Sequence, residues 1–350
     1  MSKTLQGRRR VLPAVLGLVA LMYSPKAALA QVAAGSIVES VVDPQGVRSS
    51  SVNRHDPTRL TLPRLIDLGR LDDAREKLRE QFAIQGELPR LLFFEAMILY
   101  KERQYLQSIQ RLARSLTLSD GDPDVYKLAG LNLVSLGRRD LAGPYFEAAV
   151  ELAPRDFMAR YYLGLHQLSD RRYDRAETIL RDVINLRPDY LDAYILLGVA
   201  KEQRGKEEEA IRTYHQAIEL AEQQHLKRAT PFLYLARLLI SLHRHEQSLA
   251  PLKRAVEIDS TSSEARTLLG QALTYLGRYD EALPVLMDAA ALQPRDKTAH
   301  YLLMRVYKRL GKKSEAAREM QLFRELNESG TGNRSPDDPG RPYGRRSHVR

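Results

Sequence analysis

The chain has 350 residues, of which 43% are hydrophobic and 28% charged, so there is enough apolar material for a sizeable core. It contains no cysteine, which excludes thiolate nucleophiles, disulfides and cysteine-based zinc sites. The formal net charge of +10 lies mainly at the ends, because positions 1–30 carry +5 and positions 331–350 carry +3. The remaining positions, 31–330, carry only +2, which does not favour a phosphate-binding surface over the whole fold.

The N-terminal segment, positions 1–30, has the layout of a secretory signal peptide. A basic start at residues 8–10 precedes an apolar run over 11–22 and the small-residue sequence Ala-Leu-Ala at 28–30. This layout predicts export, with cleavage before Gln31 and a mature protein that is periplasmic or secreted if the host is bacterial. The apolar run is too short to cross a bilayer comfortably, so no stable membrane span is expected after cleavage. An uncleaved anchor stays open as an alternative, as does the route, general secretory or twin-arginine.

The sequence repeats with a single period. This period is the spacing from Gly130 to Gly164, and it recurs from Gly164 to Gly198. Glycine, alanine and proline recur in fixed slots, always in that order and evenly spaced within a unit. The interval from Gly198 to Gly270 is longer than two periods by four positions, so one unit has gained an insertion of that length. The members of these series are Gly130, Ala142, Pro154, Gly164, Ala176, Pro188, Gly198, Ala210, Gly270, Ala282, Pro294 and Ala316.

Each unit predicts two helices joined by a short turn. In residues 263–294, Leu269 and Ala272 belong to an apolar series at helical spacing, Gly277 interrupts it, and a second apolar face follows. Small residues such as Gly270 and Ala282 are expected where the two helices of a pair approach each other.

These series resemble the tetratricopeptide repeat, a helix–turn–helix family of the same period with Leu-Gly in the first helix, Ala in the second and a closing Pro. The resemblance implies an all-α protein, a right-handed α-solenoid of about eight repeats. The chain departs from the family in having no Trp, in Ser108 and Ser248 where Ala is expected, and in Leu62-Pro63 where Leu-Gly is expected. The first helix of the first unit is therefore predicted to be short or absent. The units begin near residues 55, 89, 123, 157, 191, 229, 263 and 297.

The predicted organisation follows from these boundaries. Residues 31–54 form a linker, 55–228 hold repeats 1–5, and 229–328 hold repeats 6–8. The insertion falls in 217–231, where no Gly or Pro occurs before Pro231, so we expect one helix lengthened by about a turn and a step after residue 228. Residues 329–350 are rich in Arg, Pro and Gly and predict a disordered tail.

No catalytic motif stands out. The chain has no G-x-S-x-G, H-E-x-x-H or G-x-G-x-x-G sequence, and GKKS at 311–314 is expected to be an inter-helix turn. His243 and His245, beside Glu246, could present two imidazoles to a metal, but a solvated turn is the favoured interpretation. Once the repeats are assigned, no stretch of domain size remains for an enzyme site. We therefore expect no catalytic residue, no metal and no cofactor.

The family resemblance implies a groove, lined mainly by the first helices, that binds peptide segments or partner helices of other proteins. The predicted groove is apolar in its middle section and cationic further on; alternatively, several of the apolar side chains only pack between helices. Lys127 occupies a slot of the family's clamp for C-terminal carboxylates, but Leu131 stands where that clamp has Asn. Binding of chaperone C-terminal tails is therefore not supported. The predicted groove residues are Leu131, Val134, Tyr161, Leu165, Leu168, Ile195, Val199, Arg237, Gln271, Tyr301, Arg305 and Lys308.

Three hypotheses of function follow. The leading one is a non-catalytic exported scaffold that binds other proteins, such as an envelope assembly or accessory factor. The alternative is a binder of polyanions or lipid head groups that acts through the basic C-terminal tail. An enzyme with a site around His243 and His245 is the least favoured. No nucleic-acid partner is expected, because the charge of the repeat region is nearly balanced.

Overall fold

The computed structural model describes residues 60–119 and 121–331, and these form sixteen helices and no strand. This confirms the all-α prediction. The predicted signal peptide 1–30 and linker 31–54 lie outside the described residues, as do residues 332–350 of the predicted tail. The helices are α4 Leu62–Asp67, α5 Leu71–Gln85, α6 Pro89–Lys101, α7 Tyr105–Leu118, α8 Pro123–Ser135, α9 Arg139–Leu152, α10 Phe157–Ser169, α11 Tyr173–Leu186, α12 Leu191–Gln203, α13 Glu207–Gln223, α14 Thr230–Ser241, α15 His245–Ile258, α16 Ser263–Tyr275, α17 Tyr279–Leu292, α18 Lys297–Arg309 and α19 Lys313–Thr331.

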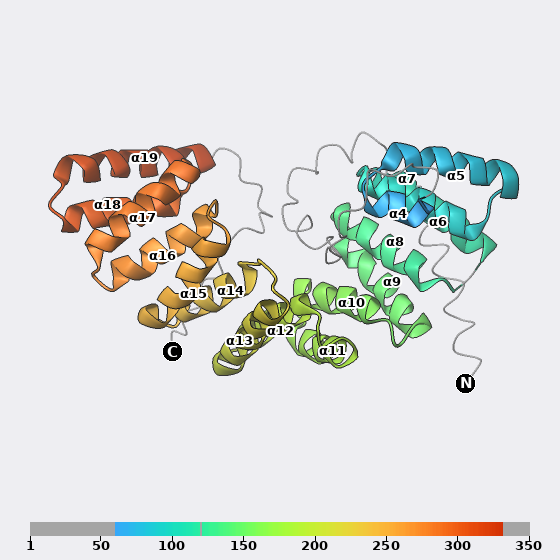
Figure 1. Cartoon of the computed structure of the whole chain (residues 1–350), viewed down its shortest axis with the longest axis horizontal. Helices are drawn as coiled ribbons and strands as arrows, with labels where there is room; N and C mark the ends of the chain where they lie inside the picture. The colour runs from blue at the N-terminus through green and yellow to red at the C-terminus, as the bar shows by residue number, and fades with distance from the viewer. Residues whose placement is uncertain (1–59, 120, 332–350) are drawn as a thin grey trace. The chain divides into compact units, whose positions relative to one another are not determined.

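The helices pack in consecutive pairs, from α4 with α5 to α18 with α19 (Figure 1). Each pair is one predicted unit, and its first helix begins within a residue of the predicted start in every unit after the first. The first unit differs because α4 has six residues, against 12 or 13 in the other first helices. A short opening helix was expected from Pro63, which lies in the first turn of α4, where a missing N–H costs little.

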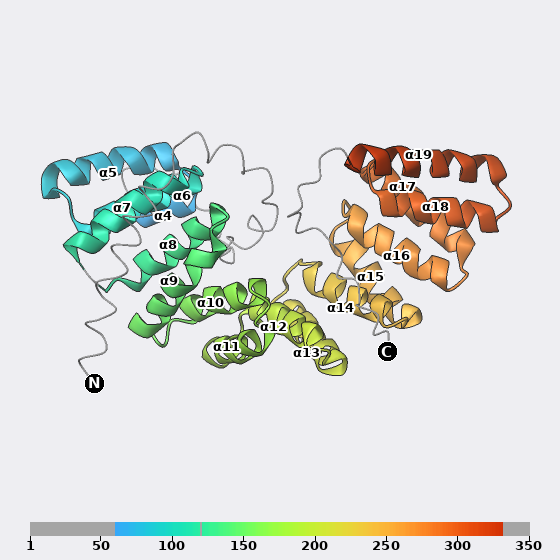
Figure 2. The ribbon, with the colours of Figure 1, turned by 180° about the vertical axis from the view of Figure 1, so that it is seen from behind.

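The described chain divides between Leu186 and Arg187 into two compact units. Unit 1 holds α4–α11 and unit 2 holds α12–α19, and in each of them successive pairs lie side by side in both views (Figures 1 and 2). The largest core of unit 1 joins α6–α10 around Tyr145 and Phe146. The largest core of unit 2 joins α14–α18 around Leu252 and Leu286. The step expected after residue 228 stays a prediction.

The extra residues of the fifth repeat are shared between a helix and a loop. Helix α13 has 17 residues, against 14 in the second helices α7, α9, α11, α15 and α17. This agrees with the expected lengthening by about one turn. His225 then adopts a positive φ of 54°, and the chain reaches α14 at Thr230.

The turn inside each pair uses a left-handed residue. In the third repeat, Gly137 has φ 75°, and the N–H of Arg138 donates to the carbonyl of Leu133 at 2.8 Å, which closes the end of α8. Gly205, Gly277 and Gly311 occupy the same slot with φ near 75°. The repeats without this glycine place Arg103, Arg171 or His243 there, also at positive φ.

The glycine series lies where the two helices of a pair meet. A Cβ added to Gly130, Gly198 or Gly270 would overlap the side chain of Phe146, Tyr214 or Leu286, respectively, on the facing second helix. At Gly164 the added Cβ would lie 3.0 Å from a methyl group of Leu180. The alanines of the second helices are fully buried at the same crossings. Close approach between helices therefore explains why both slots hold small residues.

Candidate functional site

The predicted groove residues of unit 1 differ in burial. Tyr161 in α10 has 2% of its surface exposed, whereas Leu131, Val134, Leu165 and Leu168 are half-buried. Leu131 and Val134 also pack against the large core of unit 1. Four apolar side chains on the consecutive first helices α8 and α10 thus keep part of their surface open, while Tyr161 mainly fills space between helices.

The apolar groove residues of unit 2 show the same contrast. Ile195 in α12 is buried in a cluster with Leu191 and Ala217. Val199, one turn later, is half-buried and packs against a cluster that includes Tyr214 and Leu235. Ile195 thus contributes to the core, whereas Val199 still presents some apolar surface.

Two cations on the first helices of unit 1 are already neutralised. Arg90 lies 3.2 Å from the carboxylate of Asp122 and 3.4 Å from that of Asp124. Lys127 bonds to Asp124 at 2.8 Å and to Asp156 at 2.5 Å. Burial alone would lower the pKa of Lys127, but the two carboxylates outweigh it and leave that pKa raised. These ion pairs join consecutive first helices and leave little charge for a partner.

Arg237 of unit 2 is in a similar situation. Its guanidinium pairs with Glu264 at the start of α16 and lies 5.8 Å from the ring centre of Tyr234. Gln271, the predicted neighbour in the groove, is half-buried in α16. The positive charge at Arg237 is therefore partly offset within the protein.

Arg305 of unit 2 has different surroundings. Its guanidinium carbon lies 5.2 Å from the ring centre of Tyr275 and 5.9 Å from that of Tyr301. The ion pairs of the described residues include neither Arg305 nor Lys308, which lies one turn further along α18 and is exposed. Arg237 and Arg305 are both predicted as cationic groove residues, but their surroundings differ. Arg237 has a carboxylate partner, whereas Arg305 lies against aromatic rings.

His243 and His245 lie at the turn between α14 and α15. Their ring centres are 5.8 Å apart, and the ring of His245 stacks on Tyr275 with centres 4.7 Å apart. Burial, together with the nearby His243, lowers the pKa of His245. Within the part of the chain that the structure describes, no group of three or more His, Asp or Glu side chains could hold a metal ion. The His245 ring is thus part of an aromatic contact and not of a metal cluster there.

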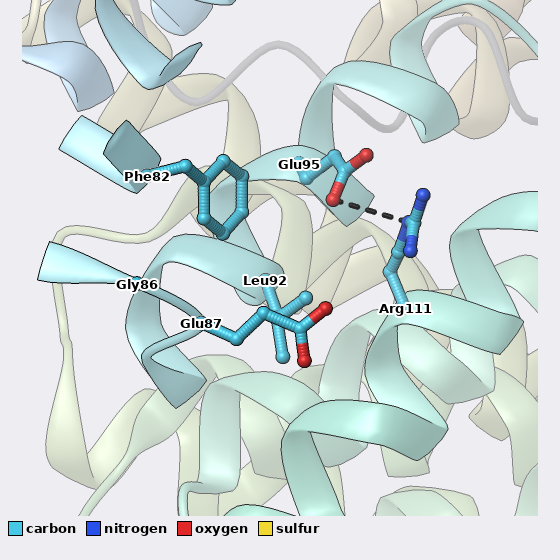
Figure 3. A pocket seen from close by; sticks show the side chains of 6 residues that line it. All are labelled: Phe82, Gly86, Glu87, Leu92, Glu95 and Arg111. Atoms are coloured by element: carbon cyan, nitrogen blue, oxygen red, sulfur yellow. Dashed lines mark ion pairs between the residues drawn. The ribbon is translucent and has the colours of Figure 1, made fainter. Parts of the chain in front are cut away.

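A hollow of about 370 Å³ lies in unit 1 between α5, α6 and α7 (Figure 3). The Glu95 carboxylate on α6 is paired with Arg111 on α7 at 3.1 Å, and Glu87 is paired with Arg114 at 3.0 Å. The charged side chains that line the hollow therefore have partners within the protein and give no sign of a ligand. The lining residues are Phe82, Gly86, Glu87, Leu92, Glu95 and Arg111.

Family models identify the repeats of this chain. Two models, both described as tetratricopeptide repeat, match residues 189–261 in one case and residues 127–190 and 267–327 in the other. Together they cover more than half of the chain. It is a tetratricopeptide repeat protein. Such proteins are scaffolds suited to protein–protein interaction, and they are generally not catalytic.

Several relatives contain the same repeats. The chain is similar to the TPR repeat-containing protein YpiA of Bacillus subtilis, with 22% identity over 72% of this chain and 59% of the relative. It is also similar to anaphase-promoting complex subunit 3 of Schizosaccharomyces pombe, with 22% identity over 50% of this chain and 26% of the relative. The chain thus spans about a quarter to three fifths of these two relatives. Among solved structures, Cut9 in the APC/C hetero-tetramer Cut9–Hcn1 matches with a TM-score of 0.56 and 14% identity, over 70% of this chain and 48% of that one, which shows the fold.

Two residues of the first-helix surface were missed by sequence reasoning. Glu202 in α12 accepts a hydrogen bond from the hydroxyl of Tyr214 at 3.0 Å, and burial raises the pKa of its carboxyl. Tyr275, at the end of α16, contacts both His245 and Arg305. The signal that the sequence offers for Tyr275 is its position, an aromatic residue two places before the turn glycine Gly277.

Among the described residues, no helix is both long and apolar enough to cross a lipid bilayer.

Proposed function

We propose that this tetratricopeptide repeat protein is a non-catalytic, exported scaffold that binds peptide segments or partner helices in a groove formed by its first helices. The observation that carries the proposal is the set of half-buried apolar side chains on α8 and α10, Leu131, Val134, Leu165 and Leu168. Apolar anchors spaced along neighbouring helices suit helix-in-groove or extended-peptide recognition. The relative in the anaphase-promoting complex is by its name a subunit of an assembly, and this supports the same kind of role.

The groove is tested by charging two of its apolar positions. Leu131→Glu with Leu165→Glu should weaken capture of a partner by tenfold or more, about 1.4 kcal/mol, because a carboxylate replaces an apolar anchor in two consecutive repeats. The partner is obtained by crosslinking residues 31–350 in the cells of origin, with mass spectrometry of the captured proteins. The affinity is then measured with the purified partner.

The matched control is Leu118→Glu with Leu152→Glu. Both leucines lie at the ends of second helices and are already 42% and 45% exposed, so capture should be unchanged. Circular dichroism and thermal melting must show that both double variants stay folded. Equal capture by the two folded double variants would contradict the groove. A chain without residues 331–350 addresses the alternative function, because loss of binding in that variant alone would favour the basic tail.

The export part of the proposal concerns residues outside the described range. The basic, apolar and small-residue segments of residues 1–30 predict that the mature protein begins at Gln31. Mass-spectrometric sequencing of the protein extracted from its own cells should find Gln31, or its cyclised form, at the N-terminus, in a fraction outside the cytoplasm. Recovery of Met1 or Ser2 together with membrane retention would refute export by cleavage.

A further inference from the structure

Aromatic side chains of four helices in unit 2 form a connected row around Arg305. His245 of α15 stacks on Tyr275 of α16, with ring centres 4.7 Å apart and planes 8° from parallel. The guanidinium of Arg305 lies within cation–π distance of both Tyr275 and Tyr301. Tyr301 in turn contacts Phe323 of α19, with ring centres 5.5 Å apart. Three consecutive repeats therefore contribute to one arginine-centred aromatic cluster.

The cluster is open to solvent at its two tyrosines. Tyr275 has 49% of its surface exposed and Tyr301 has 40%. Tyrosine and arginine are among the residue types enriched at the positions that dominate binding energy at protein interfaces. The exposed rings also hold the Arg305 side chain in place, so that less conformational freedom is lost when a partner binds.

Arg305 differs from Arg90, Lys127 and Arg237 in what its N–H groups contact. Arg90, Lys127 and Arg237 all pair with carboxylates supplied by the next repeat. For Arg305 the described residues supply ring contacts but no carboxylate and no hydrogen-bond acceptor. The N–H groups of a guanidinium form a planar fork that matches the geometry of a carboxylate. A planar acceptor can therefore still bind along its edge.

We propose that the cluster around Arg305 is an anchor for an acidic side chain within an extended partner segment, next to a flat aromatic or proline residue that packs on Tyr275 or Tyr301. The inference rests on the proposed function and names the chemistry of the partner at one place. A carboxylate matches the guanidinium edge with paired hydrogen bonds. Lys308, exposed one turn along the same helix, adds a second positive charge without a carboxylate partner among the described residues.

The observations favour a single carboxylate over a polyphosphate. Polyanion binding needs many cations along a surface, whereas positions 31–330, between the two basic ends, carry a net charge of only +2. Arg278 is already held by Glu281 at 2.7 Å, and His300 is held by Glu319 at 2.6 Å. Other cations of α18 and α19, such as Arg309, Lys313 and Arg324, are exposed, so Arg305 is distinguished by its two ring contacts and not by its charge alone.

The probe is a phage-displayed library of random peptides with no free C-terminus, selected on residues 31–350 and on the Arg305→Gln variant. The wild-type selection should enrich Asp or Glu next to Phe, Tyr, Trp or Pro, and the Arg305→Gln selection should not. A blocked synthetic copy of the best wild-type peptide should then bind Arg305→Gln at least about tenfold more weakly, or about 1.4 kcal/mol. Arg305→Lys keeps the charge but loses the paired hydrogen bonds, so its loss should be intermediate.

Matched controls separate the site from charge in general. Arg324→Gln removes an exposed arginine of α19 and should leave peptide binding unchanged. Tyr275→Ala should weaken binding while retaining Arg305, and dichroism must show the same helicity in all variants. Enrichment of apolar peptides that bind Arg305→Gln as well as wild type would overturn the anchor but support the scaffold. A library that yields no binder at all would count against the proposed function itself, and binding only of a peptide with a free C-terminal carboxylate would overturn the internal acidic anchor.

Discussion

Gly198→Leu is expected to lower the free energy of unfolding by about 1–3 kcal/mol or more, because it overpacks a helix crossing. Gly198 in α12 faces the ring of Tyr214 in α13, and Tyr214 is fully buried. A single added Cβ already overlaps that ring, so leucine must displace the ring or separate the two helices. Displacement of Tyr214 would also break its hydrogen bond to Glu202.

The measurement is thermal and urea unfolding followed by far-UV circular dichroism, with a graded pair of alanine variants as control. Gly164→Ala places its Cβ 3.0 Å from a movable methyl group of Leu180, and alanine also gains helix propensity of about 1 kcal/mol. Gly164→Ala should therefore be near neutral, whereas Gly198→Ala should destabilise. Equal midpoints for wild type and Gly198→Leu would refute the packing explanation. A strand-dominated wild-type spectrum would refute the fold.

The helix pairs could be predicted because their signals are local and repeated. Glycine at one crossing, alanine on the facing helix and a turn residue in between define a pair without knowledge of any distant contact. Pro63 likewise predicted a short α4, and the uninterrupted residues 217–231 predicted a longer α13. The division at Leu186 could not be predicted in this way, since Pro188 keeps the regular spacing of the proline series.

The turns show where a simple glycine rule is incomplete. Arg103, Arg171 and His243 adopt the left-handed conformation in the slot where other repeats have glycine. A non-glycine residue there costs about 1 kcal/mol, and the packing of the two flanking helices imposes the conformation nonetheless. The repeat period places a turn at each of these positions, although the residue type there does not indicate one.

The candidate site was only partly predictable. The position of a residue within the repeat predicts which way its side chain faces, but not which side chains of neighbouring repeats it contacts. Arg237 and Arg305 occupy equivalent slots, yet Glu264 of the next repeat neutralises Arg237, and Tyr275 of the preceding repeat contacts Arg305. Tyr161 and Ile195 occupy slots predicted to face the groove, but their surface is used in packing. Such differences depend on contacts between repeats, which the repeat period does not encode.

Ser108 shows a departure from the repeat pattern that has a physical reason. It stands in the alanine slot of α7 and is fully buried. Its hydroxyl donates to the carbonyl of Ala96 in α6 at 2.8 Å and accepts a hydrogen bond from the amide of Asn132 in α8 at 3.0 Å. Ser248 fills the same slot of α15, but its hydroxyl donates only to the carbonyl of His245 three residues earlier. One serine joins three helices, and the other makes a local bond.

Ser108→Ala should therefore destabilise the protein by about 1–3 kcal/mol even though it restores the family's preferred residue, because the buried amide of Asn132 loses a partner. Ser248→Ala should change stability by less than about 0.5 kcal/mol, since only a bond within one helix is lost and alanine favours the helix. Urea unfolding of both variants measures the difference. In an Asn132→Ala background the cost of Ser108→Ala should shrink, because the partner that needed the hydroxyl is gone. Equal effects of the two serine substitutions, or an undiminished cost in the Asn132→Ala background, would show that the hydrogen bond between α7 and α8 is not what keeps serine in that slot.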